Sequence, residues 1–358
     1  MKRHPGLLFI ICYLLFSPAA TLWAQGPNGS AKYYSAADGK CGAELKTALC
    51  SIISTGTVKR TYAQLWNDFK KTDKRADGKV WDMYSNATNF TFGTNQDKGS
   101  HPEEGYSYNR EHSFPNSWWG GTDDEAQYTD LFHLYPTDAF VNEKRSNYPF
   151  GETKGNKYKS NDGFSKLGTC TTAGYTGVVF EPNDEYKGDF ARTYFYMVTR
   201  YEEQITLWKG ASHTLDGNKY PGLKKWQLDM LLRWSEQDPV SEKEINRNKA
   251  VYGIQKNRNP FIDYPGLERF IWGDKTDVPF DYTGLRFFMA GDINDDGLVD
   301  VSDYIGVANY ILGQTQEGFN EQAADVNNDG NIDVSDYIGI ANIILTGSIY
   351  GNSTSNPE

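Results

Sequence analysis

YNREHSFPNSWWGG (Tyr108–Gly121), followed by DLFHLYPTDAFVNEKRSNYPFGE (Asp130–Glu152), gathers polar, charged and aromatic side chains into one block of the chain. Two of the five histidines of the sequence, His112 and His133, fall in this block. Around them stand further polar and charged side chains: Arg110, Glu111, Asp130, Asn142, Arg145 and Asn147. One block therefore supplies a candidate base, oxygen ligands for a metal, and cations able to pair with phosphate.

These residue types are the ones that phosphodiester hydrolysis requires. A general base must deprotonate water, a divalent cation stabilises charge on the phosphate and the leaving oxygen, and a cationic side chain binds phosphate. Histidine suits the role of base because its pKa lies near neutrality, and such catalysis contributes roughly 10²–10⁴-fold to the rate. The block therefore predicts a metal-dependent phosphodiesterase centre.

Local sequence also predicts part of the geometry of this centre. Thr137 is an acceptable N-cap for a helix that ends before Pro149. In that helix Asp138, Asn142 and Arg145 fall at positions i, i+4 and i+7, on one face. A carboxamide and a guanidinium are thus expected to point together at one phosphate.

The adjacent pair Glu111 and His112 is harder to place. In a regular strand their side chains face opposite sides, so both can act at one centre only if the strand ends or bulges there. The sequence leaves this open. Elsewhere the pattern predicts helices over 41–54, 137–147, 189–205, 222–236 and 241–252, strands around 106–114 and 176–181, and a polar loop over 150–175.

The block resembles the bacterial endonuclease I family, whose active site is a ββα-metal (His-Me) finger. Two further stretches agree with it: GDFARTYFYMVTRY (Gly188–Tyr201) and WSEQDPVSEKEINRNKAVYGIQKNRNPFIDYP (Trp234–Pro265). Together the resemblance covers nearly all of residues 32–272. It implies an α+β fold in which a mainly helical nuclease domain, residues 25–275, is built around that finger.

The resemblance also implies the roles of individual residues. His112 matches the general base that activates water, and Glu111 and Asn142 match the residues that hold one Mg²⁺. The expected activity is hydrolysis of DNA with weak sequence specificity, leaving 5′-phosphate and 3′-hydroxyl ends, with RNA left open as a second substrate. The shared motif also contains residues whose expected roles are support or phosphate binding: Arg110, Asp130, His133, Arg145 and Asn147.

Several other residues of these stretches have competing interpretations. Phe132 stands where relatives often have a second histidine, and a role of that position in tuning the metal or orienting the base would reduce activity here. Trp118 and Trp119 are expected to pack rather than to stack on bases. A structural role, in which hydrogen bonds hold loops around the centre, is expected for the polar residues of the second stretch: Arg247, Asn257, Arg258 and Asn259.

The C-terminal part of the chain contains a duplication with an offset of 33 residues, DINDDGLVDVSDYIGVANYILG from Asp292 and DVNNDGNIDVSDYIGIANIILTG from Asp325. Oxygen ligands occupy positions 1, 3, 5, 9 and 12 of each twelve-residue loop, with glycine at position 6. This spacing predicts two EF-hand-like calcium loops, because calcium prefers six to eight oxygen ligands. The predicted ligands are Asp292, Asn294, Asp296, Asp300 and Asp303 in the first loop, and Asp325, Asn327, Asp329, Asp333 and Asp336 in the second.

The duplicated pattern, with Asp rather than Glu at position 12, resembles a type I dockerin over residues 289–348. The resemblance implies a small all-α domain, two bound Ca²⁺ ions, and docking to a cohesin-like module of another protein. Recognition residues are expected at loop positions 10 and 11. These positions hold identical pairs in the two copies, Val301 with Ser302 and Val334 with Ser335.

The first 24 residues have the layout of a secretory signal peptide: a short basic segment, an apolar run and small residues before a cleavage site after Ala24. The protein is therefore expected to be secreted, with a linker over 276–288 and a tail over 349–358. Disulfides are permitted outside the cell. Helical spacing places Cys41 and Cys50 too far apart to be bridged, while a bridge from Cys170 to either, or none, stays open.

Taken alone, the net charge of −11 disfavours a polyanionic substrate, but the distribution of the charges removes that objection. Residues 289–358 contain 12 acidic side chains and no Lys or Arg, which leaves 35 acidic and 34 basic residues in 25–288. A nearly neutral domain can still carry a basic groove, because the local field steers the substrate.

Two other functions compete with the nuclease. A polysaccharide hydrolase would suit a dockerin, but it needs two carboxylates that flank one bond, and the acidic residues here gather in the calcium loops and around the histidines. A non-catalytic adaptor with a degenerate nuclease domain is the second. The presence of Glu111, His112 and Asn142 argues against it, whereas Phe132 argues for it.

Overall fold

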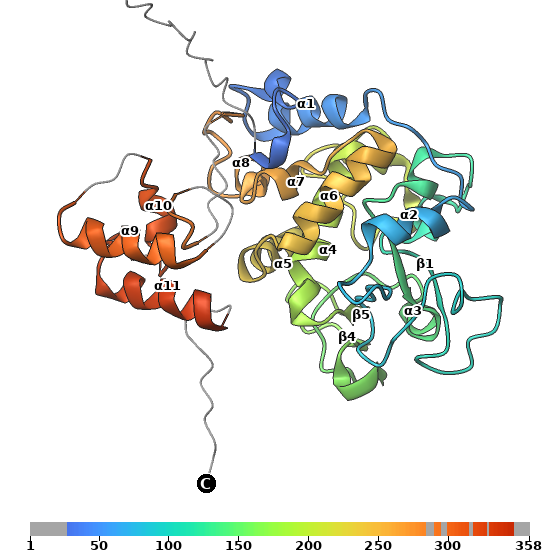
Figure 1. Ribbon diagram of the computed structural model, residues 1–358. Helices are drawn as coiled ribbons and strands as arrows, with labels where there is room; N and C mark the ends of the chain where they lie inside the picture. The colour runs from blue at the N-terminus through green and yellow to red at the C-terminus, as the bar shows by residue number, and fades with distance from the viewer. Residues whose placement is uncertain (1–26, 284–289, 295–298, 315–317, 328, 347–358) are drawn as a thin grey trace, which may run out of the picture.

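The computed structural model describes residues 27–283, 290–294, 299–314, 318–327 and 329–346. The predicted signal peptide, the predicted tail and the predicted calcium ligand Asp296 lie outside the described residues, as does most of the second half of the predicted linker. Within the described residues, helices and short strands form the domain predicted to be a nuclease, called the nuclease domain below, and a smaller C-terminal domain (Figure 1). Among those same residues no helix combines the length and the apolar character needed to cross a bilayer.

The nuclease domain is mainly helical, and its strands are short. Its helices are α1 (Gly42–Ser54), α2 (Leu65–Thr72), α3 (Ala139–Arg145), α4 (Lys187–Arg200), α5 (Lys225–Gln237), α6 (Glu242–Gln255), α7 (Pro260–Asp263) and α8 (Leu267–Trp272). Its strands are β1 (Tyr108–His112), β2 (Leu134–Asp138), β3 (Tyr158–Lys159), β4 (Lys166–Thr169) and β5 (Val178–Glu181). Each predicted helix and strand of this domain is therefore present, with ends shifted by a few residues.

Helix α4 is the centre of the nuclease domain. Every residue from Gly188 to Arg200 is buried, and the helix packs against α1, α5 and α7. A helix that is buried on all sides lacks the polar face of a surface helix. Its polar side chains must therefore find partners inside the protein, and the position of the active-site elements depends on those partners.

Strands β1 and β2 pair antiparallel, with Glu111 opposite Tyr135 and His112 opposite Leu134. Helix α3 follows β2 directly, so the three elements form a continuous strand–strand–helix unit. The helix begins later than predicted, because Thr137 belongs to β2. Its N-cap is Asp138, whose side chain accepts a hydrogen bond from the Val141 amide at 2.8 Å.

The polar stretch 150–175 is not the irregular loop that its composition predicts. It contains β3 and β4, and β4 pairs with β5 to give a three-stranded antiparallel sheet. Phe150 and Leu167 are buried in the main core. Only a few apolar side chains anchor this sheet, which is why average polarity concealed it.

The nuclease domain extends beyond residue 275, into the first half of the predicted linker (276–288). Phe280 is 1% exposed and belongs to the main core, and its backbone exchanges hydrogen bonds with Gly39 and Lys40 at 2.7 and 2.8 Å. Tyr282 accepts a hydrogen bond from Tyr264 through its carbonyl. The segment up to Thr283 therefore packs on the nuclease domain, because an aromatic side chain within it completes the core.

The C-terminal domain has a separate small core. Helices α9 (Val301–Ile311), α10 (Glu321–Ala324) and α11 (Val334–Thr346) surround Ile293, Val307, Val326 and Ile340. Helices α9 and α11 pack together, and the Tyr304 and Tyr337 rings stack at 4.0 Å. The mixed α and β architecture with a small helical C-terminal domain agrees with the prediction.

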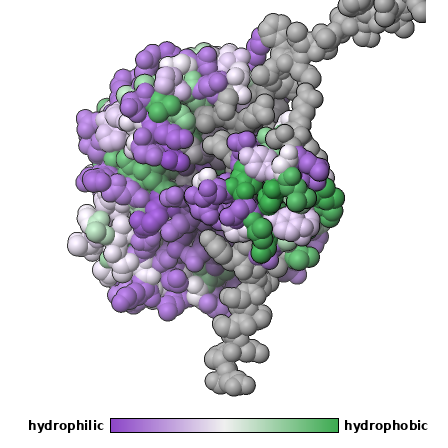
Figure 2. Space-filling model, turned by 90° about the vertical axis from the view of Figure 1, so that its left-hand side faces the viewer, coloured by the Kyte–Doolittle hydropathy of each residue, from purple (hydrophilic) through white to green (hydrophobic). Residues whose placement is uncertain are grey.

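Hydrophobic side chains remain exposed on the C-terminal domain. The repeat places them at equivalent positions of its two copies: Val301, Ile305 and Leu312 in the first, and Val334, Ile338 and Leu345 in the second. Figure 2 views the molecule from the side on which this domain lies in Figure 1, and a patch of hydrophobic residues stands out on that face.

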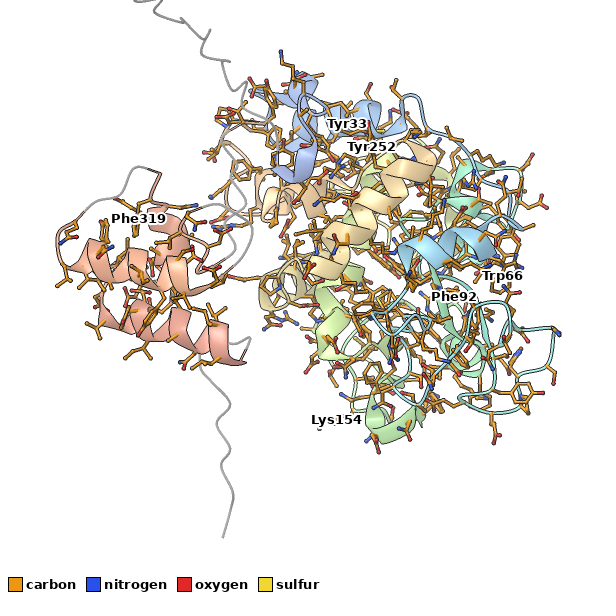
Figure 3. All side chains as sticks on the ribbon, in the orientation of Figure 1. Tyr33, Trp66, Phe92, Lys154, Tyr252 and Phe319 are labelled. Carbon is orange, nitrogen blue, oxygen red and sulfur yellow. The ribbon has the colours of Figure 1, made fainter. Side chains whose placement is uncertain are left out.

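Two smaller contacts attach peripheral segments to the nuclease domain (Figure 3). Trp66 and Phe92 pack against a satellite cluster around Tyr108, the first residue of β1. The rings of Tyr33 and Tyr252 lie 6.0 Å apart and join the N-terminal segment to α6. Three cysteines lie outside the predicted signal peptide, and each carries a free thiol: Cys41, Cys50 and Cys170.

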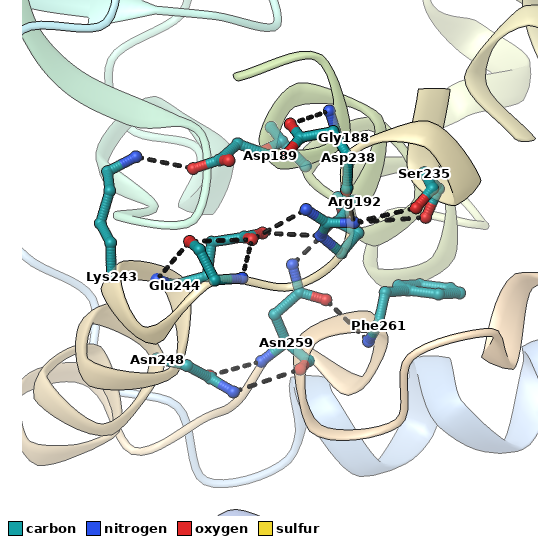
Figure 4. A network of polar contacts seen from close by, with 12 residues as sticks. Gly188, Asp189, Arg192, Ser235, Asp238, Lys243, Glu244, Asn248, Asn259 and Phe261 are labelled. Carbon is teal, nitrogen blue, oxygen red and sulfur yellow. Dashed lines mark hydrogen bonds and ion pairs between the residues drawn. The ribbon is translucent and has the colours of Figure 1, made fainter. Parts of the chain in front are cut away.

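A buried ion pair joins α4 to α6. Both carboxylate oxygens of Glu244 accept from Arg192, at 2.6 and 2.8 Å, and Arg192 also donates to the Asp238 carbonyl at 2.9 Å. Asn259 donates to the carbonyl of Arg192, and Lys243 pairs with Asp189 at 2.6 Å. Figure 4 shows these groups as one connected network.

We expect the Arg192→Met substitution to lower the free energy of unfolding by about 3 kcal/mol or more, because it leaves Glu244 buried without its cation. The matched control is Lys225→Met in the exposed pair with Asp229, for which the expected loss is below about 1 kcal/mol. Urea unfolding of the full chain measures both changes. Similar losses in the two variants would contradict this account.

Candidate functional site

A cavity of about 390 Å³ opens beside the end of β1. Its walls come from β1, from the turn after β1, and from the end of α3. The residues that line it are Tyr62, Arg110, Glu111, His112, Pro115, Asn116, Ser117, Asn142, Ser146 and Asn147. Five of the block residues singled out by sequence, including both members of the Glu111–His112 pair, are therefore brought to one cavity.

The end of β1 explains how adjacent residues reach the same cavity. Strand β1 stops at His112, so the alternation of faces no longer applies beyond it. Beyond the strand, the Ser113 amide and hydroxyl both donate to the His133 carbonyl, at 3.0 and 2.9 Å. The question that the sequence left open is thereby answered, because the strand ends at the histidine.

Glu111 is 4% exposed, and its carboxylate is oriented by two groups. The Tyr84 hydroxyl donates to Oε1 at 2.8 Å, and Arg145 donates to the same oxygen at 2.6 Å. Burial raises the pKa of Glu111, while the charge of Arg145 and hydrogen bonds from Tyr84 and Asn142 oppose that rise. The bonds from Tyr84 and Arg145 both fall on Oε1, so these two groups fix the orientation of the carboxylate.

His112 is held in one orientation by a backbone carbonyl. Its Nε2 lies 2.9 Å from the Tyr128 carbonyl oxygen, and a carbonyl only accepts, so Nε2 carries the proton. The other ring nitrogen, Nδ1, is then the basic one. Burial, together with the neighbouring His133, lowers the pKa of His112 to about 3, which keeps the imidazole neutral near pH 7.

His133 and Arg145 stand behind the cavity rather than in it. The His133 ring lies 5.4 Å from that of His112, and its Nε2 donates to the Gln127 carbonyl at 2.6 Å. Arg145 is 1% exposed and donates to Glu111 and to the carbonyls of His112 and Ser113. The expectation that Arg145 points with Asn142 at one phosphate is wrong, because the buried guanidinium is hydrogen-bonded to these three acceptors.

Asn142 and Arg110 complete the polar lining. Asn142 Nδ2 donates to Asn109 Oδ1 at 2.8 Å, which leaves its own carbonyl oxygen for other groups. The Arg110 guanidinium lies 3.5 Å from the centroid of the Tyr62 ring and 4.3 Å from that of Trp66. Arg110 is the cation that lines the cavity, and its stacking between aromatic rings limits its motion.

Asp130 has a structural position. It is 2% exposed, and it accepts hydrogen bonds from Tyr196, Tyr201, Arg200 and Gln255. The polar residues of the second stretch are also buried and hydrogen-bonded, as expected: Arg247, Asn257, Arg258 and Asn259. These groups hold the loops around the strand–strand–helix unit.

Phe132, Trp118 and Trp119 pack in the core. The Phe132 ring lies 4.6 Å from that of Tyr196, and Phe132 does not line the cavity. The Phe132 side chain therefore does not contact the cavity in which it was expected to affect the metal or the base. Trp118 and Trp119 are 1% and 9% exposed, so they pack as predicted.

Sequence reasoning missed Tyr84, Asn109 and Tyr128. Tyr84 lies 27 positions before Glu111, and nothing in its local sequence connects the two. Tyr128 acts through its backbone carbonyl, which any residue would supply. Asn109 lies inside the quoted block, but its sequence gives no sign of its role. The pairing of β1 with β2 places it opposite Thr137, close to the start of α3.

In the predicted calcium loops, carboxylates accept hydrogen bonds from backbone amides of the described loop residues. In the second loop Asp325 accepts from the amides of Asp329 and Gly330, at 3.1 and 2.9 Å. The Asp336 carboxylate is fully buried and accepts from the amides of Asn327 and Asp333. Asp303 takes the same position in the first loop, with bonds from Ile293 and Asp300. Position 12 thus closes each loop onto its helix.

Comparison with known proteins bears on this geometry. The profile of the family Endonuclease I matches residues 41–266. The chain belongs to the endonuclease I family. A second profile, that of the dockerin type I domain, matches residues 290–345. This endonuclease I family member thus carries its cavity within the first match and both loops within the second.

Three relatives of this endonuclease I chain are named extracellular nucleases. An extracellular ribonuclease of Bacillus amyloliquefaciens is 36% identical over 256 residues, which covers 67% of this chain and 78% of the relative. An extracellular ribonuclease of Bacillus subtilis (strain 168) is 35% identical over 309 residues, 76% of this chain and all of the relative. An extracellular deoxyribonuclease of Aeromonas hydrophila is 28% identical over 151 residues, 40% of this chain and 54% of the relative.

Burial of His133 leads to a pH-dependence of stability. Its pKa is lowered to about 4 by burial, against about 6.5 for an exposed imidazole. The unfolded chain therefore binds the extra proton first, and the stabilisation present above pH 6.5 is lost as the pH falls toward 4. Between pH 7 and pH 5 the unmodified protein should lose about 1–2 kcal/mol more stability than His133→Gln.

Urea unfolding at the two pH values measures this difference. The glutamine can still donate to the Gln127 carbonyl, so the comparison isolates the titrating ring. An equal loss of stability in both proteins would contradict the assignment of a buried, neutral His133.

Proposed function

We propose that this protein is a secreted, Mg²⁺-dependent endonuclease that hydrolyses phosphodiester bonds with low sequence specificity and leaves 5′-phosphate ends. The observation that carries the proposal is that Glu111, His112 and Asn142 line one cavity. The histidine there is neutral and has its basic nitrogen free. The unit of β1, β2 and α3 is accordingly assigned as a ββα-metal finger.

The proton transfer follows from the tautomer of His112. Its Nε2–H is held by the Tyr128 carbonyl, so Nδ1 accepts a proton from the attacking water. The positive charge that forms on the ring is stabilised by the same carbonyl. Arg110 is in position to contact the phosphate, because its guanidinium lines the cavity and is held by the Tyr62 carbonyl at 2.8 Å.

Glu111 and Asn142 are the residues that would hold Mg²⁺. One carboxylate and one amide oxygen suit Mg²⁺, which binds through one or two carboxylates and keeps several waters. When bound, it would stabilise negative charge on the phosphate and on the leaving oxygen.

The substrate class is nucleic acid, and both sugar types are included. Two relatives of about one-third identity are named ribonucleases, and a more distant relative is named a deoxyribonuclease. The cavity is lined by hydroxyl and amide groups at Asn116, Ser117 and Asn147 rather than by a shaped apolar pocket for one base. Such a lining favours contacts to sugar and phosphate, which carry no sequence information.

The C-terminal domain is proposed to bind two Ca²⁺ ions and to attach the enzyme to a partner protein with a cohesin-like module. The ligand sets are those predicted from the repeat. The described loop carboxylates of Asp325 and Asp336 accept hydrogen bonds from backbone amides of their own loop, which holds the loop in a turn. The exposed side chains of Val301 and Val334 stand at matching positions of the two helices.

Digestion of supercoiled plasmid and of a long RNA by the mature protein, with Mg²⁺ and Ca²⁺, tests the nuclease. We expect cleavage of both, with 5′-phosphate ends. His112→Ala should lose roughly 10²–10⁴-fold in rate because the base is gone, and Asn142→Ala should raise the Mg²⁺ concentration required. The control is His101→Ala, since His101 bonds Asp97 and Glu143 outside the cavity.

A chelator strips both metals, so it needs its own control. Asp336→Ala disrupts a calcium loop and leaves the cavity intact, and this variant should digest at the unmodified rate. If the unmodified protein cleaves neither nucleic acid over a range of metals and salt, the nuclease proposal fails and a non-catalytic adaptor becomes the better account.

Calcium titration by calorimetry tests the C-terminal domain separately. We expect two equivalents of Ca²⁺ in the unmodified protein and about one in Asp336→Ala, because the second loop loses its closing carboxylate. The first loop, closed by Asp303, is the internal reference. A stoichiometry of two in the variant would contradict the assigned ligand set.

A further inference from the structure

Strands β3 and β4 form a hairpin that carries a concentration of positive charge. We call residues 153–167 the lysine hairpin. Lys154, Lys157 and Lys159 are exposed on it, and none of the three forms an ion pair with an acidic side chain of the described chain. Figure 3 shows Lys154 at the edge of the nuclease domain, far from Tyr33.

Three acidic residues near the hairpin are already engaged, and Asp162 within it is exposed and accepts a hydrogen bond from the Asn161 side chain. Glu152 pairs with Arg233, and Glu181 pairs with Lys187 at 2.8 Å. Glu104 accepts from Ser85, Tyr158 and the amide of Asn161. The three lysine charges are therefore not neutralised by short-range partners, and a polyanion can pair with them.

The hairpin is held firmly, and its anchors lead to the active site. The Ser165 hydroxyl donates to the Tyr84 carbonyl at 2.8 Å, and the hydroxyl of the same tyrosine donates to Glu111. Thr153 Oγ1 donates to the Thr169 carbonyl at 2.8 Å. A lysine cluster on an anchored backbone loses less conformational entropy on binding than one on a mobile loop.

Helix α3 separates the lysine hairpin from the cavity. The Tyr158 ring lies 6.2 Å from the Phe140 ring, and the Lys144 ammonium lies 4.4 Å from the centroid of that same ring. Phe140 precedes Asn142 by two positions, so the two side chains face roughly opposite sides of the helix. The hairpin and the cavity are thus about one helix diameter, roughly 10–12 Å, apart.

We propose that the lysine hairpin is a second nucleic-acid-binding surface, which contacts backbone phosphates about three nucleotides from the bond that is cleaved. The spacing follows from one phosphate per roughly 3.4 Å of helix axis on each strand. The inference rests on the proposed nuclease function. It specifies which surface the substrate backbone contacts after it leaves the cavity. Lys144 extends the same surface along α3.

Binding to a duplex of about 20 base pairs is the first measurement, in a His112→Ala background so that the substrate survives. The test variant replaces Lys154, Lys157 and Lys159 by Gln. Loss of three phosphate contacts should reduce the slope of log K against log salt by about 2–3, since each contact contributes about 0.9. Affinity at low salt should fall by at least about tenfold.

A matched variant controls for total charge. It replaces three exposed lysines on segments that contribute nothing to the cavity, namely Lys224, Lys249 and Lys256, and its salt slope should stay unchanged. With His112 intact, both triple variants should hydrolyse the small diester bis(p-nitrophenyl) phosphate at the unmodified rate. That readout shows that the fold and the centre survive the substitutions.

The outcomes separate the two proposals. Equal slopes for the test and control variants, in a protein whose parent digests nucleic acid, overturn the lysine hairpin and leave the nuclease standing. A reduced slope for the test variant alone supports the hairpin even if the parent fails to cleave, in which case the nuclease proposal falls. Loss of diester hydrolysis in the test variant also counts against a surface that acts only on the extended substrate.

Discussion

The buried guanidinium of Arg145 is the constraint on which the site depends. It donates to Glu111 and to the backbone carbonyls of His112 and Ser113, so one side chain from the end of α3 fastens the end of β1. A buried ion pair repays its desolvation only when further hydrogen bonds satisfy both partners. The Tyr84 hydroxyl supplies one of these to Glu111, and the carboxylate is left with one orientation.

The proposed base, His112, is also oriented by few contacts. A single carbonyl, that of Tyr128, selects the tautomer of His112, and a second buried imidazole, His133, packs beside it. Burial holds both rings neutral. Backbone carbonyls and packing therefore fix the orientation of both rings.

Charge is distributed unevenly between the two parts of the chain. The acidic residues of the C-terminal repeat lie in loops suited to a hard divalent cation, whereas unpaired lysines lie on the nuclease domain. The net charge of −11 therefore describes neither part. Each domain has its own hydrophobic core, so the two surfaces form independently.

The sequence by itself determined the family-specific block, the calcium repeat, and most helices, because these signals are local: spacing, periodicity and capping residues. It placed Glu111, His112 and Asn142 in one centre through the motif. Only the tertiary structure decided that β1 ends at His112, that Arg145 is buried against Glu111, and that Phe132 packs away from the cavity. Those outcomes depend on Tyr84, Tyr128 and Tyr196, which are distant in sequence. No local pattern encodes a hydrogen bond across 27 residues or one made by a backbone carbonyl, so folding was needed to reveal them.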